Sequence, residues 1–137
     1  MYKITNEENT LVNTFENHTK ACRAVEFSNS GDILFSVSKD KSIMLTDVKT
    51  GKLISNYENT HETSIYSLCV INENMIATGD DDGTVKVWDI RDKDKTPLLS
   101  LKEVDDYISC IKTNESEKHL VITSGDGYLT GINIGSR

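Results

Sequence analysis

Apolar and β-branched residues occur along this chain in short runs, separated by turns rich in glycine, asparagine, aspartate and serine. The clearest example is the stretch 78–90, TGDDDGTVKVWDI, whose pattern predicts the end of one strand, a tight turn and a second strand. Asp82-Gly83 favours the turn, because glycine tolerates positive φ and aspartate can bond its own backbone. A valine-rich run ending in Trp88, the only tryptophan, is typical of the strand that follows.

The same pattern recurs at 36–48, SVSKDKSIMLTDV, and at 122–134, ITSGDGYLTGINI. The turn aspartates Asp40, Asp82 and Asp126 are therefore 42 and 44 residues apart. A period in the low forties built from short strands is typical of a propeller with four-stranded blades. No window shows helical periodicity. The predicted strands are 22–27, 33–37, 42–47, 53–58, 65–70, 75–79, 84–89, 98–102, 107–112, 119–124 and 128–133.

At these residues the chain resembles the WD40 family. Trp88-Asp89 is the dipeptide that names the family, and Thr60-His61 and Asn17-His18 stand where its repeats begin with Gly-His. The resemblance implies a buried hydrogen-bonded set in each repeat. In the second full repeat the set is His61, Thr78, Asp82 and Trp88; in the first it is His18, Ser36 and Asp40, with Thr46 in the tryptophan position; the third keeps only Asp126, beside Val104, Ile122 and Ile132.

We therefore expect an all-β fold of WD40 propeller blades, each a four-stranded antiparallel sheet, in an incomplete arc of about three blades. The expected units are the last two strands of a partial blade at 1–17, repeat 1 at 18–60, repeat 2 at 61–103, and repeat 3 at 104–137 without its last strand. A blade has two apolar faces, so the rest of a propeller is needed to close the fold.

Composition narrows the function. The net charge of −7 and the pI near 4.9 argue against direct nucleic-acid binding, which needs clustered lysine and arginine. No apolar run reaches the length of a membrane span and no targeting segment opens the chain, so we expect an intracellular protein without a membrane partner. Cys22, Cys69 and Cys110 lack metal or redox spacing and are predicted to be small buried residues in a reducing compartment.

No catalytic, cofactor or metal site is expected. A hydrolytic triad is not expected, because the sequence contains neither a G-x-S-x-G nucleophile elbow nor a histidine beside a plausible nucleophile. A calcium loop at Asp80, Asp81 and Asp82 fails because Thr78 stands where the first ligand should be. The histidine-containing set is accordingly predicted to be structural rather than catalytic.

Two further resemblances bear on function. Trp88-Asp89-Ile90-Arg91 resembles the W-D-x-R box of substrate receptors that dock on the cullin-4 ubiquitin-ligase adaptor, against which a simply solvated Arg91 is the alternative. The segments 18–28, 37–48, 72–91 and 123–134 look like the WD repeat-containing protein 55 family, matching an early portion of its members. That resemblance implies a nucleolar scaffold in ribosome biogenesis and ribosomal RNA production, with pre-ribosomal assembly factors as partners.

Partner-binding residues are expected on one rim of the blades, where loops enter the first strands and join the second to the third. Blade one offers positive side chains there and blade two negative ones, which would orient a charged partner. The candidates, with those of the W-D-x-R box, are Lys20, Arg23, Lys39, Lys41, Asp81, Asp89 and Arg91.

Overall fold

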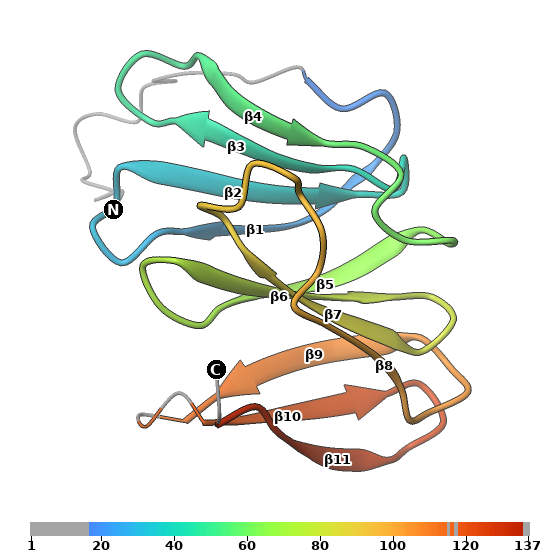
Figure 1. Cartoon of the computed structure of the whole chain (residues 1–137). Helices are drawn as coiled ribbons and strands as arrows, with labels where there is room; N and C mark the ends of the chain where they lie inside the picture. Colours follow the sequence, from blue (N-terminus) through green and yellow to red (C-terminus); the bar gives the residue numbers. More distant parts are fainter. Residues whose placement is uncertain (1–16, 115, 117, 136–137) are drawn as a thin grey trace, which may run out of the picture.

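The computed structural model describes residues 17–114, 116 and 118–135, which form three antiparallel sheets (Figure 1). The all-β fold expected from the sequence is confirmed. The expected strands of 1–17 lie almost wholly outside the described residues. Sheet 1 contains β1 (Cys22–Phe27), β2 (Ile33–Ser38), β3 (Ile43–Asp47) and β4 (Leu53–Tyr57); sheet 2 contains β5 (Ile65–Val70), β6 (Met75–Asp80), β7 (Thr84–Asp89) and β8 (Leu99–Lys102); sheet 3 contains β9 (Ile108–Thr113), β10 (His119–Ser124) and β11 (Leu129–Asn133).

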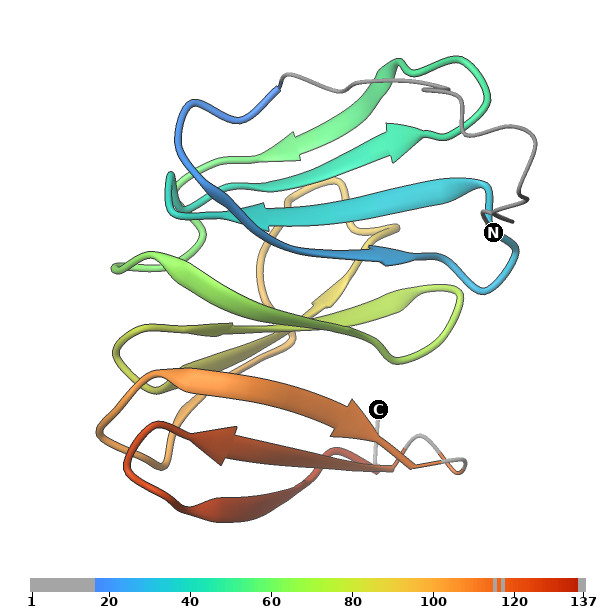
Figure 2. The same ribbon diagram turned by 180° about the vertical axis from the view of Figure 1, so that it is seen from behind.

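The sheets are stacked face to face in chain order and do not close into a ring, as both views show (Figures 1 and 2). Within each sheet every strand pairs with the next in sequence, so hairpin loops join the strands of a sheet and further loops lead to the neighbouring sheet. This meander of three or four short strands per sheet is what the turn signals in the sequence predict.

Two apolar layers hold the stack together, one on each face of sheet 2. Phe35, Val37 and Ile43 of sheet 1 meet Ile76 and Trp88 of sheet 2 in the first layer. The second layer packs sheet 2 against sheet 3 and includes Ala77, Val85, Val87, Ile108, Leu120 and Ile122. Sheet 2 is therefore covered on both faces, which explains why its strands lack a strict alternation of apolar and polar residues.

The turns that precede the first strands meet the turns between second and third strands at one rim of the stack. In sheet 1 the amide of Lys39 donates to the carbonyl of Ala21, and in sheet 2 the amide of Asp81 donates to the carbonyl of Ser64. Gly83, with φ of +92°, makes the turn of sheet 2 compact, and a Cβ there would lie 2.2 Å from the Val104 carbonyl oxygen. The rims of sheets 2 and 3 are consequently in direct contact.

Candidate functional site

A chain of buried hydrogen bonds joins three residues of sheet 2 to one residue of the loop before it. His61 Nδ1 lies 2.8 Å from Asp80 Oδ2, and His61 Nε2 lies 2.7 Å from Thr78 Oγ1. The indole Nε1 of Trp88 donates to the same Thr78 oxygen at 2.9 Å. Thr78, Asp80 and Trp88 share one face of the sheet, so the set fastens the incoming loop to β6 and β7.

The donors and acceptors in this set allow one consistent arrangement. An indole N–H can only donate, so Thr78 Oγ1 accepts it and gives its own hydrogen to His61 Nε2. His61 then donates from Nδ1 to the Asp80 carboxylate. Burial lowers the pKa of His61 and outweighs the opposite effect of Asp80, so the imidazole stays neutral. The two ring nitrogens of His61, the Thr78 hydroxyl and the Trp88 indole N–H are therefore all engaged in hydrogen bonds within the set.

The prediction that Asp82 supplies this carboxylate is wrong. Asp82 lies in the exposed turn, where its Oδ2 is 3.2 Å from Lys102 Nζ. Asp80 takes the role because it follows Thr78 by two residues and so points to the same face of β6. Burial acts to raise the pKa of Asp80, but hydrogen bonds from His61 and from the amides of Thr84 and Asp82 outweigh it and lower the pKa.

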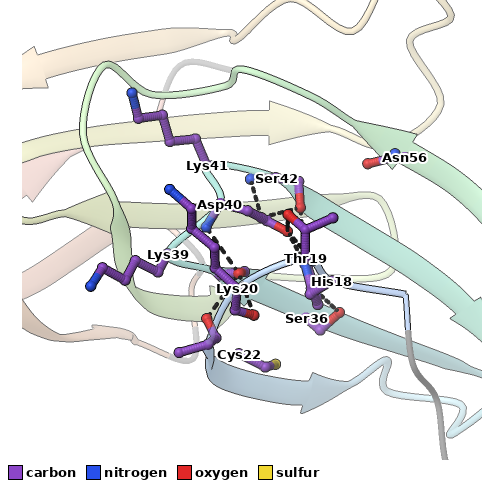
Figure 3. Close-up of polar contacts among 12 residues, drawn as sticks. His18, Thr19, Lys20, Cys22, Ser36, Lys39, Asp40, Lys41, Ser42 and Asn56 are labelled. Atoms are coloured by element: carbon purple, nitrogen blue, oxygen red, sulfur yellow. Dashed lines mark hydrogen bonds and ion pairs between the residues drawn. The ribbon is translucent and has the colours of Figure 1, made fainter.

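Sheet 1 carries a corresponding set in which the turn aspartate does reach the histidine (Figure 3). His18 Nε2 lies 2.8 Å from Ser36 Oγ, and His18 Nδ1 lies 3.2 Å from Asp40 Oδ2. Ser42 donates to Asp40 Oδ1 at 2.5 Å and lies 2.9 Å from His18 Nδ1. Asp40 is used here because Ser38 occupies the place that Asp80 holds in sheet 2, and Ser38 donates instead to the carbonyl of Ala21.

Thr46, in the tryptophan position of sheet 1, is buried but too small to replace an indole. A cavity of about 220 Å³ lies beside it, bounded by His18, Ser36 and Thr46 among others. In sheet 3, Val104, Ile122 and Ile132 are buried in the apolar layer, as their residue types require. Asp126 stays in the turn and accepts a hydrogen bond from Ser124.

The lysines proposed for partner binding surround the turn of sheet 1. Lys20 and Lys39 are exposed and Lys41 is half-buried. Figure 3 shows the ammonium groups of Lys39 and Lys41 pointing away from the hydrogen-bonded cluster around Asp40. Lys41 has φ of +70°, and its carbonyl accepts hydrogen bonds from both the amide and the hydroxyl of Thr60. The backbone that presents these lysines is thus fixed to the loop entering sheet 2.

Two rim candidates of opposite charge turn out to be paired with each other. Arg23 Nη1 on β1 donates to Asp81 Oδ1 on the turn of sheet 2 at 2.8 Å. The guanidinium also lies over the ring of Tyr66, 5.3 Å from its centroid. The charge boundary between blades one and two, which the sequence indicates, is therefore bridged by an ion pair.

The W-D-x-R segment lies at the end of β7. Arg91 is 67% exposed, and its Nε and Nη2 donate to the two carboxylate oxygens of Asp89 at 3.1 and 2.9 Å. The hydrogen bonds from Arg91 lower the pKa of Asp89, and the carboxylate in turn raises the pKa of Arg91. Arg91 and Asp89 thus form a bidentate ion pair on the surface.

The prediction that all three cysteines are buried is wrong for two of them. Cys69 is buried in the layer between sheets 2 and 3, and burial raises its pKa to about 11. Cys22 and Cys110 are exposed. Cys110 precedes Ile111, which faces sheet 2, so the alternation of β9 turns Cys110 to the opposite face.

Within the described ranges, no three His, Cys, Asp or Glu side chains are grouped as a metal site. That part of the chain also contains no helix long and apolar enough to span a bilayer.

The stacked antiparallel sheets and the histidine-centred hydrogen-bond sets of sheets 1 and 2 define a class of repeat protein. The WD domain, G-beta repeat model matches residues 9–47 and 51–89, more than half of the chain. The chain belongs to the WD40-repeat family, whose members are typically non-catalytic.

Among known proteins the chain is similar to WD repeat-containing protein 55 homologs. It is 56% identical to the homolog from Aedes aegypti and 52% identical to that from Drosophila virilis, over all 137 residues in both cases. The homolog from Drosophila willistoni is 50% identical over the same length. The chain spans only 27–29% of the length of these relatives.

Sequence reasoning missed Asp80, Tyr66 and Tyr107. The signal for Asp80 was its two-residue spacing from Thr78, which the three consecutive aspartates obscured. Tyr66 and Tyr107, whose ring centroids are 4.9 Å apart, belong to different blades. Only the stacking of sheets 2 and 3 brings them together.

Proposed function

We propose that this chain is part of a WD-repeat scaffold that mediates protein–protein interactions in nucleolar ribosome biogenesis and ribosomal RNA production. The observation that carries the proposal is the similarity to WD repeat-containing protein 55 homologs along the whole chain. The partners would be pre-ribosomal assembly factors, and the site of action the nucleus and nucleolus.

The geometry supports a docking role. The histidine sets and the two apolar layers fix the sheets, while charged side chains stand at the rim on short, hydrogen-bonded turns. A surface that is ordered before binding loses little conformational entropy when a partner docks. Buried hydrogen-bond sets with every member satisfied serve that rigidity.

Lys39 and Lys41 are the contacts proposed for an acidic protein or an RNA-bearing particle. Their ammonium groups extend from a turn whose backbone is held by Thr60 and Ser64. Rim charges act mainly on the association rate and its salt dependence. The Lys39→Glu/Lys41→Glu double variant of the full-length protein should therefore bind such a particle more slowly. Unchanged binding and an unchanged salt dependence would refute this contact, and Lys49→Glu/Lys52→Glu on the β3–β4 turn is the matched control.

The process itself is tested by depleting the full-length protein in cells and pulse-labelling ribosomal RNA. We expect precursor RNA to accumulate and mature RNA to fall, with rescue by the unaltered protein. Normal precursor processing after complete depletion would overturn the proposal.

Docking on the cullin-4 adaptor is the second candidate, favoured by the exposed and bidentately held Arg91. In that role the protein would be a substrate receptor of a ubiquitin ligase. Arg91→Ala should then abolish co-purification of the adaptor and leave the thermal stability of the protein unchanged, since the side chain is on the surface. If Arg91→Ala has the same partners as the unaltered protein, Arg91 is a solvated residue and the ligase role falls.

A further inference from the structure

The first strand of each sheet carries a β-bulge near its start, and the bulged residues are Arg23, Tyr66 and Ser109. A bulge re-aims the extra side chain and is often found beside functional sites. Here the bulge of sheet 1 sends Arg23 to the rim of sheet 2. Its guanidinium lies over the Tyr66 ring and pairs with Asp81 at 2.8 Å. The rim of sheet 2 thus already holds one arginine between an aromatic ring and a carboxylate.

The aromatic row continues into sheet 3. The ring of Tyr107 is tilted against that of Tyr66, with 4.9 Å between centroids. Gly125 makes room for it, because a Cβ at that position would lie 2.1 Å from the Tyr107 ring. The amide of Gly125 also donates to the Tyr107 carbonyl at 3.0 Å. Tyr107 is therefore held over the β10–β11 turn by the shape of the backbone.

The rims of sheets 2 and 3 both carry carboxylates, and the pairing of these carboxylates differs between the two sheets. On sheet 2, Asp81 pairs with Arg23 and Asp82 with Lys102. On sheet 3, the carboxylates are Asp105, Asp106 and Asp126; within the residues that the structure describes they form no ion pair, and the segments 103–108 and 124–129 contain neither lysine nor arginine.

Tyr128 completes the surface on sheet 3, where it is 65% exposed. The two rims are continuous, because the loop before β9 packs on the turn at Gly83. We call the five residues on sheet 3 the acidic–aromatic rim: Asp105, Asp106, Tyr107, Asp126 and Tyr128.

We propose that the acidic–aromatic rim binds an arginine-bearing, basic segment of a partner protein. A guanidinium is suited to it because it stacks on a tyrosine face and donates hydrogen bonds from its edge to a carboxylate, as Arg23 does one sheet away. A phosphate backbone is repelled by the same carboxylates. The inference rests on the proposed role as an interaction scaffold and adds to it the site and the partner chemistry.

The test uses the full-length protein and a fluorescent nine-residue peptide of alternating arginine and glycine, with binding followed by anisotropy. The Asp105→Asn/Asp126→Asn variant should weaken binding about tenfold, and Tyr128→Ala about fivefold, as expected for contacts of 1–1.4 kcal/mol each. Asp32→Asn/Asp94→Asn, which removes two other exposed carboxylates, should leave binding unchanged. Replacing the arginines of the peptide by lysine should weaken binding as Tyr128→Ala does.

Equal binding by the unaltered protein, both rim variants and the Asp32/Asp94 control would overturn the inference, as would absence of binding. Tighter binding of polyuridine than of the arginine peptide would overturn it in favour of an RNA surface. These outcomes are separate from the proposed function. If the peptide fails to bind while depletion still blocks ribosomal RNA processing, the scaffold role is supported and the arginine-binding site is refuted.

Discussion

Asp80 and Asp82 are two residues apart and make very different contributions to the stability of the fold. Asp80 is buried against His61 and accepts hydrogen bonds from the amides of Asp82 and Thr84, whereas Asp82 faces solvent beside Lys102. We expect Asp80→Asn to lower the free energy of unfolding of the full-length protein by about 2–3 kcal/mol, because charge-assisted bonds are lost in the interior.

Asp82→Asn is the matched control and should change stability by less than about 0.5 kcal/mol, because exposed ion pairs contribute little. Urea denaturation followed by tryptophan fluorescence measures both. Equal effects of the two variants would contradict the assignment of Asp80 to the histidine set.

The same set makes stability depend on pH. The pKa values of His61 and Asp80 are both lower in the folded protein than their ordinary values, so the unfolded chain binds more protons as the solution is acidified. The contribution of His61 is fully present above about pH 6.5 and is lost as the pH falls toward its folded pKa; that of Asp80 is lost only below about pH 4.

Denaturation of the full-length protein between about pH 7.5 and 5.5 should therefore show stability falling with acid, within the window of a histidine with a lowered pKa. His61→Gln should flatten this part of the profile, and His119→Gln, which removes an exposed histidine, should not. A profile that is steeper in His61→Gln than in the unaltered protein would contradict a neutral buried His61.

At the scale of the elements, the packing of β6 against β9 leaves no space at Gly79. A Cβ there would lie 2.6 Å from Ile108 Cβ and from Ser67 Oγ. Gly79→Ala should cost about 1–3 kcal/mol, the usual effect of an added group in a filled core. Gly131→Ala in β11 is the control, because no atom lies within 4 Å of its Cβ position. Equal melting temperatures of the two variants would show that sheets 2 and 3 do not pack in this way.

The strands could be predicted from the sequence because local signals determine them. Gly31, Gly51, Gly83 and Gly127 all have positive φ in turns, and both ends of every predicted strand lie within one residue of the observed ends. The exposure of Cys22 and Cys110 could not be predicted in this way. Exposure depends on which sheet face has a neighbour, and that information is absent from the strand itself.

The candidate site likewise contains features that the sequence predicts and features that it does not. Turn positions alone predict that Arg23 and Asp81 are rim residues, yet their pairing needs the bulge of sheet 1 and the stacking of sheet 1 on sheet 2. The resemblance to the WD40 family points to Asp82, and only the face of β6 on which each side chain lies shows that Asp80 takes its place. Contacts within a hairpin can thus be predicted from the spacing of residues in the sequence, whereas contacts between blades cannot.

At the scale of the whole molecule, three stacked sheets leave an open face and a free edge. Val121 and Leu129 on sheet 3 are exposed, and among the residues that the structure describes β11 pairs only with β10. The isolated 137-residue chain should therefore self-associate through these surfaces, since unpaired strands and apolar faces promote aggregation. Sedimentation velocity measures this. A monodisperse monomer that melts cooperatively in calorimetry would contradict the need for the rest of a propeller.

The central claim is that the full-length protein is a scaffold for pre-ribosomal assembly factors. Affinity capture of that protein from cell extract, with mass spectrometry of its partners and Arg91→Ala alongside, tests it most directly. We predict that both forms recover ribosome-assembly factors. Recovery of the cullin-4 adaptor by the unaltered form alone, without assembly factors in either sample, would contradict the account and favour the ligase receptor.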